Sequence, residues 1–265
     1  MTADTFELAK GYTVNNATQH STGLFLLDRL NVKPGMHVLD IGCGPGNLTA
    51  HIAELVGPTG KVVGIDPSKE RLALAQDLAT TRSNLTFEVG QAEDLSRFAD
   101  DSFDVVYVNA TFHWIGDQAR AVREFHRVLK PGGGQLGISG GCGDFVADHE
   151  KVKATVMAQE PFCQYPDKDG IGPKFVKRAE MQQLLDLAGF VDYSMVINKL
   201  VKQVKDGYAM LEWLDTSSSG KTYGAVPPEL KPQAREAMKR EWDKLTTEDG
   251  IKMDMELLVT VATKS

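Results

Sequence analysis

One acidic residue and three glycines form the stretch of this chain that could hold a ligand. Asp40 follows a short apolar run, and glycines come after it at alternate positions, at Gly42, Gly44 and Gly46. A buried strand that turns tightly into a helix needs such glycines, because a ligand lies against bare backbone there and φ must be free to become positive. A carboxylate at the strand end would repel a dinucleotide pyrophosphate, and the G-x-G-x-G spacing departs from the dinucleotide pattern. The pattern therefore predicts a ligand with a positive charge.

A second acidic residue, Asp66, lies twenty residues beyond Gly46, at the tip of the next predicted strand. A carboxylate there can accept hydrogen bonds from both hydroxyls of a ribose. The alternative is a structural acid ahead of the helix that follows Pro67 and Ser68. We favour ribose binding, because Asp40 and Asp66 together fit one ligand.

The sequence from His37 to Gly46, H-V-L-D-I-G-C-G-P-G, resembles motif I of the class I S-adenosylmethionine-dependent methyltransferases. The resemblance implies that the loop passes under the methionine part of S-adenosylmethionine and that Asp40 supports binding of its ammonium group. It also implies an α/β fold, in which a Rossmann-like, doubly wound seven-stranded sheet has the order 3-2-1-4-5-7-6, an antiparallel strand 7 and a helical lid. S-adenosylhomocysteine would be the product.

The same resemblance extends the cofactor site along the tips of the neighbouring strands. The family usually has an acid at the position of Gln91, and a glutamine can still accept from the adenine amino group and donate to a ring nitrogen. Ala92 would contact the adenine through its backbone N–H, whereas Glu93 is either a ligand contact or a solvated acid in a turn. Pro67 and Asn109, at the tips of the second and fourth strands, complete the predicted cofactor contacts.

The tip of the fourth strand carries the groups that could face a methyl acceptor. It offers Asn109, His113 and Trp114, and neither an acid nor a lysine. Methyl transfer from a sulfonium is an in-line displacement, so the protein mainly aligns the acceptor with the methyl group and excludes water. A hydroxyl or ammonium acceptor needs a base, whereas a carboxylate is already ionised at pH 7.

His113 and Trp114, with Tyr12 and Gln19 near the start, resemble the methyltransferase 11, trans-aconitate, juvenile hormone acid and plant salicylate and jasmonate carboxyl methyltransferases. The resemblance implies that Gln19 and Trp114 hold a substrate carboxylate through side-chain N–H donors, and that Tyr12 closes over the cofactor. We therefore expect a small-molecule acceptor, with a carboxylic acid as the candidate. The competing structural roles are a core aromatic for Trp114, an exposed helix residue for Gln19 and a packed imidazole for His113.

Other functions stay open on the sequence alone. His113 could contact the cofactor, or it could be the general base of an O-, N- or S-methyltransferase. An arsenite methyltransferase would need several converging thiolates, but Cys43 lies in the glycine loop and leaves only Cys142 and Cys163. A cyclase or sensor that binds S-adenosylmethionine without transferring its methyl group also fits a site that is poor in acids.

Hydrophobic periodicity indicates the elements that position these residues. We predict strands over residues 38–41, 61–65, 85–89, 102–108, 135–139, 193–204 and 255–263. We predict helices over residues 48–56, 68–80, 117–130, 176–188, 208–214 and 228–245, and a largely helical segment over 4–30 that breaks near Gly11. A single domain, 1–265, would then have a core of about 31–140, 176–204 and 253–265, and a lid formed by about 1–30, 141–175 and 205–252.

Composition limits the class of protein. The 265 residues are 42% apolar, enough for one α/β domain with a large core. A net charge of −7 without a basic stripe argues against a nucleic-acid partner. Short apolar runs and the polar start predict a cytoplasmic protein without a membrane span. The three cysteines lack C-x-x-C spacing, so we expect no disulfide framework and no metal site. The oligomeric state is not predicted.

Overall fold

The structure is a computed structural model that describes residues 5–167 and 172–265. The strands are β1 (His37–Ile41), β2 (Lys61–Asp66), β3 (Leu85–Val89), β4 (Val105–Asn109), β5 (Gln135–Gly141), β6 (Asp192–Val204) and β7 (Ile251–Thr263). The helices are α1 (Phe6–Asn15), α2 (Ala17–Leu27), α3 (Asn47–Val56), α4 (Lys69–Ala79), α5 (Gln118–Val128), α6 (Asp148–Met157), α7 (Arg178–Ala188), α8 (Gly207–Ser217) and α9 (Lys231–Asp243). Single 3₁₀ turns are η1 (Phe112–Trp114), η2 (Phe162–Gln164) and η3 (Pro228–Leu230).

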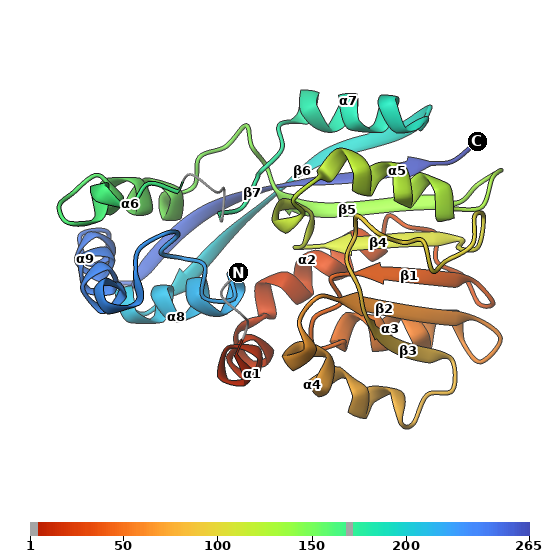
Figure 1. The fold of residues 1–265 in the computed structure, drawn as a ribbon, viewed down its shortest axis with the longest axis horizontal. Coiled ribbons are helices and arrows are strands. Elements are labelled where there is room, and N and C mark those ends of the chain that lie inside the picture. Colours follow the sequence, from red (N-terminus) through yellow and green to blue (C-terminus); the bar gives the residue numbers. More distant parts are fainter. Residues whose placement is uncertain (1–4, 168–171) are drawn as a thin grey trace. The chain divides into compact units, whose positions relative to one another are not determined.

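The strands form one sheet with the order β3-β2-β1-β4-β5-β7-β6, and Figure 1 shows β3 to β5 side by side. The pairs from β3 to β5 are parallel, and β7 runs antiparallel to β5. The predicted Rossmann-like order and the antiparallel seventh strand are therefore confirmed. Because parallel strands end at the same edge, the tips of β1, β2, β4 and β5 lie along one edge of the sheet.

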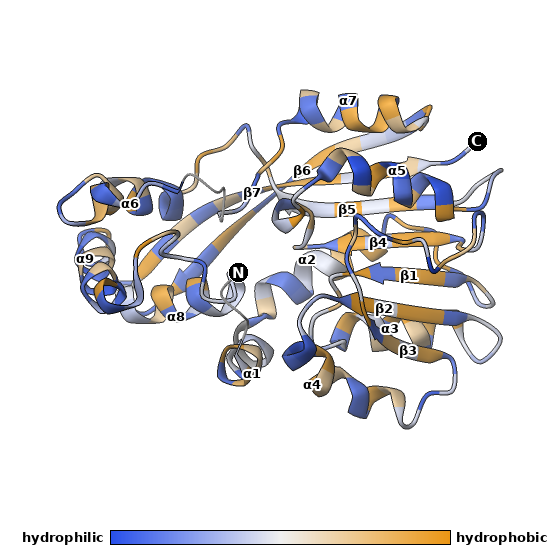
Figure 2. Ribbon diagram, in the orientation of Figure 1, coloured by the Kyte–Doolittle hydropathy of each residue, from blue (hydrophilic) through white to orange (hydrophobic). Residues whose placement is uncertain are grey.

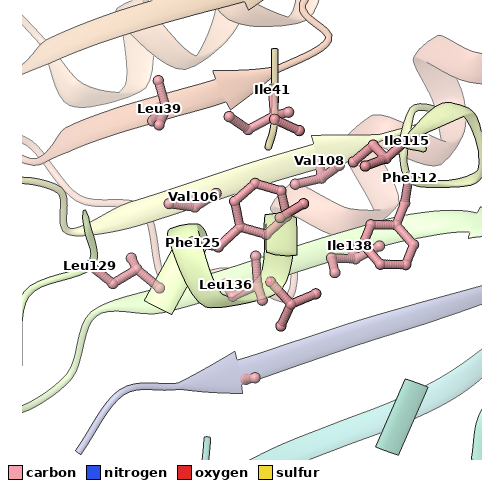
Figure 3. Packing of buried hydrophobic residues seen from close by; sticks show 14 of the residues in the cluster. Leu39, Ile41, Val106, Val108, Phe112, Ile115, Phe125, Leu129, Leu136 and Ile138 are labelled. Atoms are coloured by element: carbon pink, nitrogen blue, oxygen red, sulfur yellow. The ribbon is translucent and has the colours of Figure 1, made fainter. Parts of the chain in front are cut away.

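The central strands are apolar because helices cover both of their faces, and β4 is buried along its whole length. Figure 2 shows β1, β2 and β4 largely in the hydrophobic colour. On one face, α5 buries Val122, Phe125 and Val128 at helical spacing. Figure 3 shows Phe125 lying against Val106 and near Leu136. This packing fixes the strands whose tips carry the candidate site.

The other face of the same strands is covered by α2 and α3. Leu26 and Leu30 pack there with Ile52 and Val56 over Tyr107 of β4, and all five side chains are buried. Successive residues of a strand point to opposite faces, so Val38 joins this cluster while Leu39 joins the cluster under α5. The helix α2 is thus packed directly on the sheet.

The contacts within the chain divide it into two compact units. Unit 2 consists of residues 17–142, 175–198 and 257–265, and unit 1 of residues 1–16, 143–174 and 199–256. Residues 17–30, which we expected in the lid, cluster with unit 2, whereas residues 199–204 and 253–256, which we expected in the core, cluster with unit 1. The role of unit 1 as a lid stays a prediction.

Unit 1 has a hydrophobic core of its own, formed by α6, α8, α9 and the first part of β7. Met210, Met238 and Trp242 are almost fully buried there. The helix α1 packs on α8, where a Cβ on Gly11 would lie 2.8 Å from Cγ2 of Thr216. The predicted helix break at Gly11 is wrong, because close packing uses this glycine inside α1 and the break falls at Asn16.

Other elements also differ from the prediction. The fourth strand begins at Val105, not at residue 102, and continues through Asn109. The helix predicted over 228–245 starts as η3 and continues as α9, with a proline in its first turn. The helix α6 was not predicted, because only Val152 and Val156 are buried on it. Among the described residues, no helix is long and apolar enough to cross a bilayer.

Candidate active site

The carboxylate of Asp40 lies at the end of β1 and is 3% exposed. Oγ1 of Thr49, in the first turn of α3, donates a hydrogen bond of 2.6 Å to Oδ2 of Asp40. Burial raises the pKa of Asp40 to about 7, against the lowering effect of the Thr49 hydrogen bond, and the charge of Asp66 raises it further. The site thus holds a carboxyl group that changes its charge near neutral pH, and a cation beside it would favour the ionised form.

The carboxylate of Asp66 lies at the end of β2 and uses both of its oxygens. The backbone N–H of Gly44 donates to Oδ2 at 3.0 Å, and the N–H of Ser68 donates to Oδ1 at 2.8 Å. The first bond ties the glycine loop to the tip of β2, and the second closes the turn at Pro67. A carboxylate has about four acceptor positions, which is more than these two bonds use.

The side chains of Phe87 and Thr111 pack closely against the glycine loop. Gly46 has a φ of 83°, and a Cβ there would lie 2.5 Å from Cζ of Phe87. Gly42 has a φ of 71°, and a Cβ there would lie 2.3 Å from the side chain of Thr111. Oγ1 of Thr111 also donates to the carbonyl oxygen of Gly42 at 3.3 Å, which joins the loop to the segment after β4.

The segment after β3 holds the predicted adenine contacts in a tight turn. Gln91 forms a β-bridge with Asp94, and Ala92 is 6% exposed. Oε1 of Glu93 accepts hydrogen bonds from the N–H groups of Gly116 and Asp117, at 2.9 and 3.3 Å. The carboxylate of Glu93 thus connects this turn to the start of α5, and its contact with a cofactor stays a prediction.

The tip of β4 places His113 and Trp114 in the turn η1. Ala110, just before the turn, has a φ of 53°, an uncommon conformation for a non-glycine residue and one that is often found at functional sites. The ring of His113 lies 5.2 Å from that of Trp114 and 5.1 Å from that of Phe175, measured between centroids. Nδ1 of His113 is buried and lies 3.2 Å from the position of a Cβ on Gly140. The imidazole is therefore enclosed on several sides.

The other predicted residues lie on the helices near the start of the chain. Gln19 is half-buried in α2, and its backbone carbonyl oxygen accepts a hydrogen bond of 2.9 Å from Nδ2 of Asn109. The structure thus brings Gln19 to the tip of β4, to which η1 is also attached. Tyr12 lies in α1, which belongs to unit 1, and its closure over the cofactor stays a prediction.

Comparison with known proteins assigns the family. The family model described as "Methyltransferase domain" matches residues 32–189, which is more than half of the chain and includes the glycine loop and the tips of β2 to β5. The chain belongs to this family. The chain has the fold of the class I S-adenosylmethionine-dependent methyltransferases, and S-adenosylmethionine is the cofactor of the family.

Individual relatives resemble parts or the whole of this methyltransferase chain. A demethylmenaquinone methyltransferase from Staphylococcus carnosus is 36% identical over 108 residues, which are 41% of this chain and 44% of that protein. The YcgJ protein from Bacillus subtilis covers 92% of this chain and 98% of its own, with 22% identity and a TM-score of 0.63. The [4+2]-cyclase SpnF covers 92% of this chain and 80% of its own, with 20% identity and a TM-score of 0.58. These two structures show a shared fold.

Three residues with contacts at the candidate site were missed on the sequence. Thr49 follows Gly46 by three residues, and its place in the first helical turn could have indicated a hydroxyl beside Asp40. Thr111 and Phe175 gave no such signal, because their partners in the glycine loop and in η1 are distant in the sequence. Within the described part of the chain, no group of histidine, cysteine, aspartate or glutamate residues could hold a metal ion. Cys43, Cys142 and Cys163 do not form disulfides with one another.

Proposed function

We propose that this chain transfers the methyl group of S-adenosylmethionine to a small-molecule acceptor. One observation carries the proposal: two buried carboxylates, Asp40 and Asp66, stand at neighbouring strand tips, and the glycine loop between them donates to Asp66 through the N–H of Gly44. Burial disfavours the charged form of a carboxyl group, and a nearby positive charge offsets this cost, so two buried carboxylates beside a bare-backbone loop favour a cationic ligand.

The roles of the two acids follow from their surroundings. Asp40 faces the ammonium group of the cofactor, whose positive charge stabilises the ionised carboxylate against the effect of burial. Asp66 is oriented by the N–H groups of Gly44 and Ser68, and its remaining acceptor positions take the ribose hydroxyls. The sulfonium methyl group then points to the acceptor, and reaction needs only in-line alignment and the exclusion of water.

We propose a carboxylate as the acceptor. In support, the backbone carbonyl oxygen of Gln19 accepts a hydrogen bond from Asn109 at the tip of β4, and Trp114 lies in η1, the turn that follows this strand. Their side-chain amide and indole N–H groups are donors that can hold a carboxylate without adding a competing nucleophile. A carboxylate acceptor also needs no base.

The packing of His113 bears on the alternative, an O-, N- or S-methyltransferase that uses this residue as a base. Its Nδ1 atom is buried, and its ring lies beside Trp114 and Phe175. A base would therefore have to act through Nε2. We assign His113 a packing role at the acceptor site, in which it holds Trp114 in place.

A methyl-transfer screen tests the proposal. Purified protein with S-adenosylmethionine is offered benzoate, trans-cinnamate, octanoate and trans-aconitate, and in parallel phenol, benzylamine and thiophenol. Mass spectrometry should detect S-adenosylhomocysteine and methyl esters with the acids. Methylation of the phenol, amine or thiol alone would refute the carboxylate acceptor, and cofactor binding without any S-adenosylhomocysteine would refute methyl transfer in favour of a cyclase or sensor.

Two substitutions test the assignment of the acceptor residues. Gln19→Ala and Trp114→Ala should each lower kcat/KM for the carboxylate by about tenfold or more, the usual effect of losing a donor to a charged group. S-adenosylmethionine affinity, measured by calorimetry, should change less than threefold. A parallel loss of cofactor affinity in both variants would contradict the assignment.

A further inference from the structure

The side-chain amide of Asn109 is occupied by the helix α2. Its Nδ2 atom donates to the carbonyl oxygen of Gln19 at 2.9 Å, and its Oδ1 atom accepts from Oγ1 of Thr22 at 3.3 Å. Asn109 is 9% exposed and Thr22 is 3% exposed, so these bonds are shielded from water. A buried hydrogen bond that loses one partner leaves the other unsatisfied, which makes such a contact costly to break.

The contact is specific for an amide. Nδ2 faces a carbonyl oxygen, which can only accept, and Oδ1 faces a hydroxyl group, which can donate. Oγ1 of Thr22 also lies 3.0 Å from the carbonyl oxygen of Gln19, so its single proton is shared between two acceptors. An aspartate in place of Asn109 would have the same shape but would set an acceptor against the Gln19 carbonyl oxygen.

A second, independent feature fixes α2 at the same place. Gly23 lies so close to the sheet that a Cβ there would be 2.5 Å from the hydroxyl oxygen of Tyr107, 3.0 Å from Nδ2 of Asn109 and 2.4 Å from Cδ1 of Leu48. Distances under 3.0 Å require neighbouring atoms to move. The helix therefore sits against β4 and α3 without space for a methyl group.

We infer that Asn109 is a positioning residue that acts through α2, by fixing the backbone of Gln19 and hence the amide that holds the acceptor. The inference rests on the proposed function. It changes the role that the sequence suggested for Asn109, because the side-chain amide serves the acceptor side of the site and not the cofactor.

Asn109→Ala and Asn109→Asp test the inference by two measurements. Hydrogen exchange of the amides in residues 17–27 should become about tenfold faster or more, as expected when a buried hydrogen bond is lost, with the larger effect for Asn109→Asp. The KM for the carboxylate most rapidly methylated in the screen should rise about tenfold. The dissociation constant of S-adenosylhomocysteine, measured by calorimetry, should change less than threefold.

Asn84→Ala is the matched control, because Nδ2 of Asn84 donates to the carbonyl oxygens of Ala53 and Gly57, both at 2.8 Å, at the end of α3. This variant should speed exchange near residues 53–57 and leave both the exchange of α2 and the acceptor KM unchanged.

Two results would overturn the inference. One is unchanged exchange in residues 17–27 in both Asn109 variants. The other is a weakening of S-adenosylhomocysteine binding by tenfold or more with an unaltered acceptor KM, which would assign Asn109 to the cofactor. Wild-type protein that binds neither form of the cofactor would refute the proposed function instead, and the exchange measurement would still decide whether Asn109 anchors α2.

Discussion

The tips of β1 and β2 carry the same functional group in different surroundings. Asp66 is held by two backbone N–H groups, from the glycine loop and from the turn at Ser68. Asp40 is held by one side-chain hydroxyl, that of Thr49. Backbone donors persist whatever side chains surround them, whereas the partner of Asp40 is removed by a single substitution.

The different hydrogen-bond partners of Asp66 and Asp40 suggest different roles, one in the shape of the loop and one in the charge of the site. Asp66 joins the glycine loop to the sheet, so it supports the shape of the site in addition to its proposed contact with the ribose. In the proposed site Asp40 contributes charge, and its pKa of about 7 makes that charge sensitive to the surrounding groups, which include Thr49 and Asp66. Substitutions at the two tips should therefore differ in kind.

The largest effect is expected for Asp66→Ala. The change leaves the N–H groups of Gly44 and Ser68 without their carboxylate partner, which costs about 2–4 kcal/mol in the free energy of unfolding. It also removes the ribose contacts, so S-adenosylmethionine affinity should fall at least about a hundredfold. Thermal unfolding and calorimetry measure the two losses. A stable variant that loses only affinity would show that Asp66 serves the ligand alone.

Asp40→Asn should lower S-adenosylmethionine affinity by about ten- to thirtyfold at pH 8, because a charge-assisted contact becomes a neutral one. Its stability should not fall, since an asparagine oxygen can still accept from Thr49 and no charge is buried. If Asp40→Asn lost stability as well as affinity, Asp40 and Asp66 would not differ in role, and the proposed contrast would be wrong.

The wild-type protein and Asp40→Asn should differ in how their stability and cofactor affinity depend on pH. The pKa of Asp40 is raised from 3.8 to about 7 in the folded protein, so between these values the unfolded chain has released a proton that the folded chain keeps. The contribution of Asp40 to stability therefore falls as the pH rises from about 4 to about 7 and is constant above. Cofactor affinity should rise over the upper part of this range, because binding needs the ionised acid. Asp40→Asn should show neither trend.

The smallest effect is expected for Thr49→Val, which removes the hydrogen bond that lowers the pKa of Asp40. The midpoint of the rise in cofactor affinity should move up by about one pH unit, the shift that corresponds to one charge-assisted hydrogen bond. Thr49→Ser keeps the hydroxyl group and should keep the wild-type midpoint. Calorimetry from pH 6 to pH 9 gives both midpoints, and identical values would contradict the role of Thr49.

The sheet order was implied by the resemblance to the class I methyltransferases, whereas the strands and the glycine loop were predicted from signals that are local or periodic in the sequence. Asp40 and Asp66 were recognised because each lies at or next to the last residue of a predicted strand. The contact of Asn109 could not be predicted, because its partner is the backbone carbonyl oxygen of Gln19. Every residue type has such a carbonyl group, so the sequence does not indicate which one is used. Gly11 was misinterpreted for a related reason, since its use in packing against Thr216 depends on a helix 200 residues away.

The chain enters and leaves each unit several times, and this has a consequence for its synthesis. Unit 2 is assembled from residues 17–142, 175–198 and 257–265, so neither unit can be cut out as one continuous fragment. The strand β7 lies between β5 and β6, so its place in the sheet is filled only after residues 257–263 have left the ribosome. A nascent chain that stops near residue 250 would expose the bare edge of β5, and truncation there should yield an aggregating product.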